Sequence, residues 1–205
     1  IFEAHPDIQA GITLPNGAIY AFPYVTDPIL PTIYSVASVN KTMMEQAGVA
    51  MPRTLDELTD LLYAFKALGE DVVPLGGGYE AKNPSRILLE ALGFETMDSQ
   101  GLSICLRSGE VVLPGADETY REYLTLMKRF YQDGIVDPDF YTLDDVTIAS
   151  QAAGGLLGLM GTPTDGFTAD PKIFQQYTTL SPLTSGFADE AVVVKNNYYT
   201  AGGAV

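Results

Sequence analysis

Two short loops carry the side chains best suited to chemistry, and each directly follows an apolar run, Val72–Leu75 or Leu156–Met160. The loop residues combine bare backbone, an aromatic ring, hydroxyls and carboxylates, which can hold a neutral, hydroxyl-rich ligand. The candidate binding residues are Gly78, Tyr79, Glu80, Thr162, Thr164 and Asp165. Ligands of α/β proteins bind at the carboxyl ends of strands, so the position of both loops favours a function in binding.

Each loop also has a purely structural interpretation. The glycines before Tyr79 can form a flexible turn, and they lack the Gly-Lys-Ser/Thr or GxGxxG pattern of a nucleotide site. In the second loop, Thr162-Pro163 can be an N-cap followed by proline at the first helical position. Helix amides also bind ligands, so both interpretations of this loop remain open.

Acidic residues raise the possibility of an enzyme. A glycosidase needs two carboxylates on opposite sides of a bond, and Glu80 and Asp165 could supply them. The acidic stretch 137–145 is more typical of a turn at Asp137-Pro138 and a helix cap at Thr142. Calcium would need a denser set such as DxDxDG, which the sequence lacks, so we expect no metal site.

The composition limits the partners that the chain can have. Its 26 acidic and 11 basic residues give a net charge of −15. Because phosphate contact needs clustered Lys and Arg, this balance argues against nucleic acid and anionic membrane surfaces. No apolar run approaches the ~20 residues that span a bilayer, so we expect no membrane insertion by this chain. One histidine and one cysteine, Cys105, form no zinc pattern, and we expect no cofactor.

Capping residues and glycines mark the starts and ends of several predicted helices. Thr54-x-x-Glu57 fits a capping box and starts a helix that ends at Gly69. A second long helix runs from Asp117 to Asp133, and we interpret its aromatic stripe as core packing. Shorter helices are predicted over residues 40–47, 83–92, 143–153 and 171–177.

Strand signals alternate with the helices. The predicted strands are Ala18–Phe22, Ile33–Val39, Val72–Leu75, Leu156–Met160 and Ala191–Val194, with a hairpin of 103–106 and 110–113 around Ser108-Gly109. This alternation predicts an α/β fold, with a mixed sheet flanked by helices. Pro23 is expected to end the first strand and to leave Tyr24 at its exit.

Three segments, in order along the chain, resemble the motifs of a known family. Residues 16–24, NGAIYAFPY, resemble the segment "DGKIYALPY". Residues 40–58, which include NKT and P-R-TLDEL, resemble "NKTWLDKLGL-x-P-x-TLDEL", and residues 131–140, YQDGIVDPDF, resemble "YKEGLIDPDF". These motifs are typical of the bacterial extracellular solute-binding proteins, family 1, which are similar to maltose-binding protein.

The resemblance implies a periplasmic-binding-protein-like (type II) clamshell, in which two α/β lobes close on a solute. Residues 1–205 would form a single lobe of this discontinuous domain, with the first lobe and the C-terminal helices absent. The implied function is non-catalytic: the extracellular solute-binding component of an ABC importer, which delivers a carbohydrate or oligosaccharide to a membrane permease. The implied location is extracellular, anchored as a lipoprotein through a missing N-terminus, or periplasmic.

By position, the resemblance places Tyr24 at the edge of the cleft and the two loops where the family contacts its ligands. The sequence departs from the family in two respects, since it has no tryptophan and residues 67–74 replace the common "DPNGNGKKDEIP" stretch with its possible cation loop. Tyr24 and Tyr79 could still stack on sugar rings. The alternatives are a carbohydrate-active hydrolase domain and a ligand-sensing ectodomain.

Overall fold

The chain divides into two compact units. Unit 1 comprises Ile1–Tyr34 and Lys195–Val205, and unit 2 comprises Ser35–Val194. The computed structural model describes residue 3 and residues 6–20, 23–25, 37–95, 104–188, 190–194 and 199–201. Both candidate ligand loops belong to unit 2, so this unit positions the site.

Unit 1 contains a short helix and a two-stranded sheet. Helix α1 spans Pro6–Ile12, and strand β1 (Pro23–Val25) pairs antiparallel with β9 (Tyr199–Ala201). Tyr24 is the central residue of β1, and its side chain lies outside the described part of the structure. The prediction that Pro23 ends a strand is wrong: Pro23 is the first residue of β1, a position that tolerates its missing N–H.

The predicted strand Ala18–Phe22 does not form over residues 18–20. Ile19 makes only an isolated antiparallel bridge with Thr13. The Ala18 N–H donates to Asn16 Oδ1 at 3.0 Å, so it belongs to a turn rather than to a ladder. The last two residues of this prediction lie outside the described residues.

A four-stranded mixed sheet forms the centre of unit 2. Its strands, in the order β3-β7-β2-β8, are β3 (Val73–Gly76), β7 (Leu157–Met160), β2 (Ser38–Asn40) and β8 (Tyr177–Thr179). Strands β3 and β7 are parallel, whereas β2 is antiparallel to both of its neighbours. The predicted mixed sheet is confirmed, although β2 is shorter than predicted and residues 33–36 lie outside the described residues.

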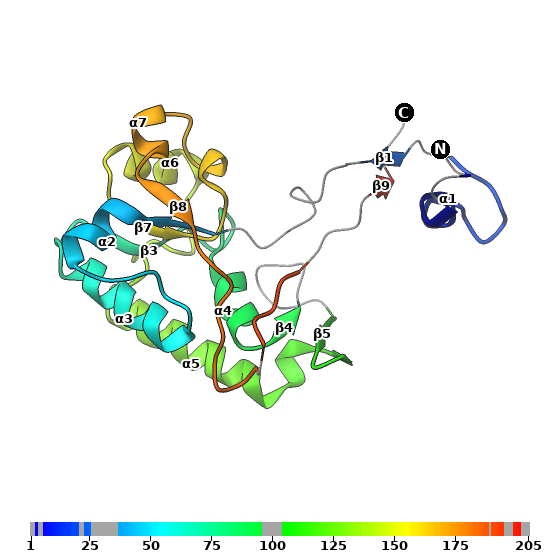
Figure 1. The fold of residues 1–205 in the computed structure, drawn as a ribbon, viewed down its shortest axis with the longest axis horizontal. Coiled ribbons are helices and arrows are strands. Elements are labelled where there is room, and N and C mark those ends of the chain that lie inside the picture. The colour runs from blue at the N-terminus through cyan, green and yellow to red at the C-terminus, as the bar shows by residue number, and fades with distance from the viewer. Residues whose placement is uncertain are drawn as a thin grey trace. The chain divides into compact units, whose positions relative to one another are not determined.

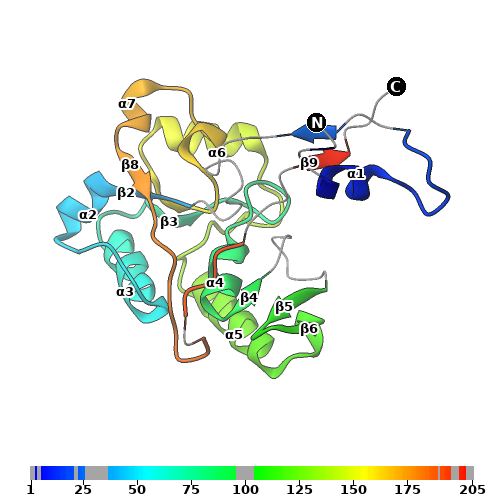
Figure 2. The same cartoon turned by 45° about the vertical axis from the view of Figure 1, so that its right-hand side comes forward.

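Helices cover both faces of this sheet. They are α2 (Lys41–Ala47), α3 (Leu55–Lys66), α4 (Ser85–Ala91), α5 (Glu118–Gln132), α6 (Asp145–Ala153) and α7 (Pro171–Phe174), with 3-10 turns η2 (Pro114–Ala116) and η3 (Thr164–Gly166). Figures 1 and 2 show α3 on one side of the sheet and α6 and α7 on the other. The fold class is α/β, as predicted.

Helix α3 begins at the predicted cap. Thr54 Oγ1 accepts from the Glu57 N–H at 3.1 Å. The Glu57 carboxylate accepts from the Arg53 N–H at 2.7 Å, one residue before the position that a capping box predicts. The buried face of the helix consists of Leu58, Leu61, Leu62 and Phe65.

Two predictions near the end of unit 2 are wrong. The helix predicted over 171–177 ends at Phe174, and Tyr177 begins β8, where its hydroxyl donates to the Leu157 oxygen at 2.6 Å. The strand predicted over Ala191–Val194 does not form, although Val194 is buried. A run of apolar, β-branched residues favours a strand, but it does not show whether the backbone finds a partner strand.

Unit 2 also contains a small antiparallel sheet. It consists of β4 (Phe94–Glu95), β5 (Cys105–Arg107) and β6 (Glu110–Val112), in the order β4-β5-β6. The predicted hairpin between β5 and β6 is confirmed. Its turn residues Ser108 and Gly109 take φ angles of 53° and 79°, as a tight hairpin requires.

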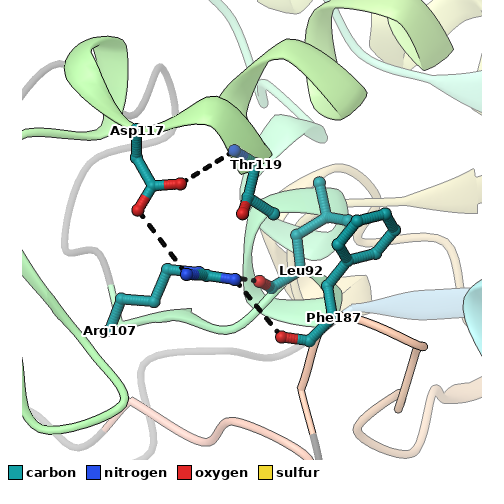
Figure 3. A network of polar contacts seen from close by, with 5 residues as sticks. All are labelled: Leu92, Arg107, Asp117, Thr119 and Phe187. Atoms are coloured by element: carbon teal, nitrogen blue, oxygen red, sulfur yellow. Dashed lines mark hydrogen bonds and ion pairs between the residues drawn. The ribbon is translucent and has the colours of Figure 1, made fainter.

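Arg107 ties this small sheet to three other segments (Figure 3). Its Nη1 lies 3.5 Å from Asp117 Oδ2, and Asp117 in turn accepts from the Thr119 N–H at 2.8 Å. Its Nη2 donates to the Phe187 oxygen at 3.3 Å, and its Nε donates to the Leu92 oxygen at 3.5 Å. The guanidinium therefore holds the end of α4, the start of α5 and the segment around residue 187 at one point.

The main sheet meets α3 where only glycine fits. A Cβ added to Gly158 of β7 would overlap the Phe65 ring and lie 2.6 Å from the Pro74 oxygen of β3. Phe65 is completely buried in the main apolar cluster of the described residues. The close approach of helix and sheet therefore depends on the missing side chain at position 158.

We expect Gly158→Ala to destabilise unit 2 by about 1–3 kcal/mol, because the extra carbon forces Phe65 or β3 to move. Urea unfolding followed by circular dichroism measures the change in free energy. Gly186→Ala is the matched control, since a Cβ there meets nothing within 4 Å. Equal unfolding midpoints for the two variants would contradict this account of the packing.

Candidate functional site

The parallel strands β3 and β7 bring the two candidate loops together. Gly76 pairs with Met160, so both strands end at the same edge of the sheet. The loops that follow are in contact there, since a Cβ on Gly161 would lie 2.7 Å from Pro84 Cα. Ser38, at the start of β2, forms a 3.0 Å hydrogen bond with Thr164 of the second loop.

The glycines of the first loop allow other parts of the chain to pack closely against the loop backbone. Gly77 has a φ of +106°, which favours glycine. The Gly78 N–H donates to the Ala81 oxygen at 2.7 Å, and a Cβ on Gly78 would lie 2.7 Å from Leu143 Cβ. Gly78 is buried, and this packing accounts for the glycine. Its effect on the site is to fix the backbone that carries Tyr79.

Tyr79 lies in a cavity of about 590 Å³, which we call the aromatic cavity. Its N–H donates to the Phe140 oxygen at 2.7 Å, which fixes the backbone beside the loop that carries Tyr141. The rings of Tyr79 and Tyr141 have centroids 5.6 Å apart and planes tilted by 37°. The cavity is lined by Tyr79, Tyr120, Tyr123, Leu124, Met127, Lys128, Tyr131, Gln132, Val136, Phe140 and Tyr141.

Further aromatic contacts continue around this pair. The Tyr141 ring lies 5.3 Å from Phe140 and 6.5 Å from Tyr131, centroid to centroid. Tyr141 is 67% exposed, whereas Phe140 is buried beneath it. The cavity therefore presents exposed aromatic faces that are held in place by buried ones.

Tyr123 forms part of the buried floor. Its hydroxyl donates to Ser85 Oγ at 2.8 Å, and burial raises its pKa to about 12. Burial likewise raises the pKa of Tyr177, on the other side of the sheet, to about 12. Both phenols are neutral under physiological conditions and act as hydrogen-bonding anchors of the core.

The second loop borders a different pocket. This polar pocket, of about 300 Å³, is lined by Lys82, Asp145, Ile148, Ala149, Asp165, Gly166, Phe167, Thr168 and Ala169. Lys82 Nζ lies 3.5 Å from Asp145 Oδ1, and Asp165 is exposed. The predicted site residues are thus divided, with Tyr79 in the aromatic cavity and Asp165 in the polar pocket. Glu80 is exposed and lines neither.

The predicted N-cap at Thr162 is wrong. The loop forms the 3-10 turn η3, which begins at Thr164 after Pro163 and has no side-chain cap. Thr162 is half-buried, and its side chain occupies the space where Gly166 would carry a Cβ. It therefore packs across the turn instead of capping it.

The acidic stretch 137–145 has structural roles. Asp137 is buried and accepts from the Asp139 N–H at 2.8 Å and from Gln151 Nε2 at 2.6 Å. The cap of α6 is Asp144, not Thr142, because Asp144 Oδ1 accepts from the Thr147 N–H at 2.8 Å, a bond that lowers the pKa of Asp144. Within the described residues, no group of three His, Cys, Asp or Glu is placed to hold a metal ion.

Part of the aromatic stripe on α5 is exposed, which the prediction of core packing did not include. Tyr123 and Phe130 are buried, as a core interpretation requires. Leu124 and Tyr131, also seven residues apart, lie on a neighbouring face and are 51% and 47% exposed. The signal was the width of the stripe, since two adjacent apolar faces exceed what one core contact needs. Tyr141 follows no such period and carried no signal.

Comparison with known proteins bears out the resemblance to solute-binding proteins, although no protein-family model matches the chain. The fructooligosaccharide ABC transporter substrate-binding protein FusA of Streptococcus pneumoniae serotype 4 is 26% identical over 159 residues, which are 70% of this chain and 29% of FusA. The lipoprotein LipO of Bacillus subtilis is 23% identical over 155 residues, 71% of this chain and 29% of LipO. The chain is thus similar to part of an ABC-transporter substrate-binding protein. It spans about three-tenths of the length of these two relatives.

Solved structures show the same fold. The structure of S. pneumoniae FusA in complex with kestose gives a TM-score of 0.73 at 20% identity, over 96% of this chain and 41% of that protein. An HMO-binding solute-binding protein from Bifidobacterium longum infantis gives 0.79 at 20% identity, over 98% and 44%. The predicted α/β fold, a mixed sheet flanked by helices as in part of a type II solute-binding protein, is confirmed. In the described part of the chain, no helix has the length and apolar character needed to cross a membrane.

The two buried tyrosines predict a loss of stability at high pH. A phenol whose pKa is about 12 when folded and about 10 when unfolded contributes its full stability below pH 10 and loses it as the pH rises towards 12. At pH 11 the loss is about 1–1.5 kcal/mol per tyrosine. Urea unfolding at pH 8 and pH 11 measures it.

Tyr123→Phe should remove its share of this pH dependence, because phenylalanine does not ionise. Tyr20→Phe is the control, since Tyr20 is 73% exposed. The interpretation fails if Tyr123→Phe and Tyr20→Phe lose the same stability between the two pH values.

Proposed function

We propose that the chain is one lobe of the extracellular solute-binding component of an ABC importer, and that it holds a carbohydrate or oligosaccharide against Tyr79 and Tyr141. The observation that carries the proposal is the aromatic cavity beside the carboxyl end of β3. The names of the related proteins support the class of ligand. FusA is a fructooligosaccharide-binding protein, and other similar structures contain stachyose or laminaribiose.

The geometry of the tyrosine pair suits a sugar ring. A sugar presents C–H groups on its face and hydroxyls at its edge, which matches an exposed aromatic ring surrounded by hydrogen-bonding groups. Tyr141 offers such a face, and the Gln132 amide and the Lys128 ammonium line the same cavity. Because the sequence has no tryptophan, tyrosines perform the stacking in this proposal.

The other predicted residues take secondary roles in this proposal. Asp165, exposed beside the polar pocket, accepts hydrogen bonds from sugar hydroxyls. Thr162 and Thr164 shape the second loop, and Glu80 lies at the exposed tip of the first. Tyr24 stays a predicted ligand contact, and its side chain lies outside the described residues. The site is non-catalytic, so Glu80 and Asp165 act as hydrogen-bond acceptors and not as a hydrolytic pair.

Closure of a clamshell on its solute is driven by contacts that only the closed form makes. In our proposal the closed protein docks on a membrane permease and works outside the cytoplasm, either on a lipid anchor or in the periplasm. This chain alone supplies part of those contacts. We therefore expect the isolated chain to bind sugars with dissociation constants of about a millimolar or weaker.

Replacement of Tyr79 tests the proposal. We expect Tyr79→Ala to weaken oligosaccharide binding about 3- to 10-fold, because one aromatic contact contributes about 0.5–1.5 kcal/mol. Tyr79→Phe should keep most of the affinity, since the ring remains. NMR titration of the 205-residue chain measures these weak dissociation constants.

Tyr20→Ala provides the matched control, because it removes an exposed tyrosine from unit 1. Unchanged sugar affinity in Tyr79→Ala, or a response only to peptides, polyamines or metal ions, would refute the proposed ligand class.

A further inference from the structure

The aromatic cavity extends well beyond the Tyr79–Tyr141 pair. Its second wall is helix α5, from Tyr120 to Tyr131. These eleven helical steps correspond to about 16 Å along the helix axis. The volume of about 590 Å³ falls within the roughly 300–1,000 Å³ of pockets that enclose drug-sized ligands. One sugar ring on Tyr79 and Tyr141 would leave the wall of α5 uncovered.

Leu124, Lys128 and Tyr131 are exposed residues of this wall. They follow one another at spacings of four and three and so share one helix face. Tyr131 is fixed in orientation, because its hydroxyl donates to the Pro138 oxygen at 3.1 Å. Its ring is 47% exposed and lies 6.5 Å from the Tyr141 ring. A preorganised ring next to the first platform loses little entropy when a ligand covers it.

Lys128 gives the wall a hydrogen-bonding group. Among the described residues that line the cavity, it is the only charged side chain. The residues three and four positions away on the helix are Leu124, Thr125, Tyr131 and Gln132, none of them acidic. Its ammonium can therefore donate to sugar hydroxyls, as can the neighbouring Gln132 amide.

We infer that Leu124, Lys128 and Tyr131 form a second sugar subsite, so that the cavity selects oligosaccharides of three or more rings over shorter ones. The inference rests on the proposed function. Continuity with the Tyr79–Tyr141 platform favours a sugar as the occupant of this wall. The amine of Lys128 and the amide of Gln132 favour it too, since an apolar protein surface would leave them unpaired.

The experiment compares sucrose, kestose and fructo-nystose, which contain two, three and four rings, as ligands of the full 205-residue chain in NMR titrations. We expect affinity to rise at least threefold from two rings to three. Tyr131→Ala should abolish this rise, so that the ratio of the kestose affinity to the sucrose affinity falls towards one. Tyr131→Phe should keep most of the rise, because the stacking face remains. Tyr79→Ala should weaken the binding of all three sugars.

Phe174→Ala is the matched control, since it removes a 49% exposed aromatic ring from α7, outside the cavity. Affinity that does not depend on ring number would overturn the second subsite but leave the proposed function standing. If Tyr131→Ala weakens the binding of all three sugars equally, the second subsite is also overturned and the proposed function stands. That result would fit a wall of α5 that is covered by another polypeptide segment. A response of the chain to peptides, polyamines or metal ions, with no response to these three sugars, to stachyose or to laminaribiose, would overturn both.

Discussion

The parallel pairing of β3 with β7 determines where every feature of the site lies. It places the ends of two strands, distant in sequence, side by side, and their following loops then pack against each other through Gly161 and Pro84. On the side of the sheet that α3 covers, Gly158 has no side chain and so leaves room for the Phe65 ring. Helix α3 can therefore approach the sheet closely. The relative position of the two loops is therefore set by the sheet.

The tyrosines of unit 2 occupy two kinds of environment, which differ in burial. Tyr123 and Tyr177 lie inside, hydrogen-bonded to Ser85 and to the Leu157 oxygen, and there the hydroxyl satisfies the interior. Tyr131 and Tyr141 lie at the surface with rings partly open to solvent. An exposed apolar face of this kind is typical of a binding surface rather than of a domain interior.

Local signals in the sequence predicted the elements whose ends they mark. The Thr54 cap placed α3, and Ser108-Gly109 placed a hairpin, because a cap and a tight turn depend on a few neighbouring residues. Strand pairing depends on distant partners, so the prediction over Ala191–Val194 was wrong and β8 went unrecognised. The candidate loops were found from their place after strands. The exposure of Tyr131 was not predicted, because the periodic spacing of apolar residues on a helix does not show which of them other segments cover.

Arg107 holds several parts of unit 2 together through the oxygen of Leu92, the oxygen of Phe187 and the carboxylate of Asp117 (Figure 3). Two of these three acceptors are main-chain atoms, which every amino acid provides. Evolution can therefore exchange the half-exposed side chain at position 187 with little effect on this junction. An insertion or deletion nearby would move the carbonyl out of reach of the guanidinium. The segment is tolerant of substitution but constrained in length.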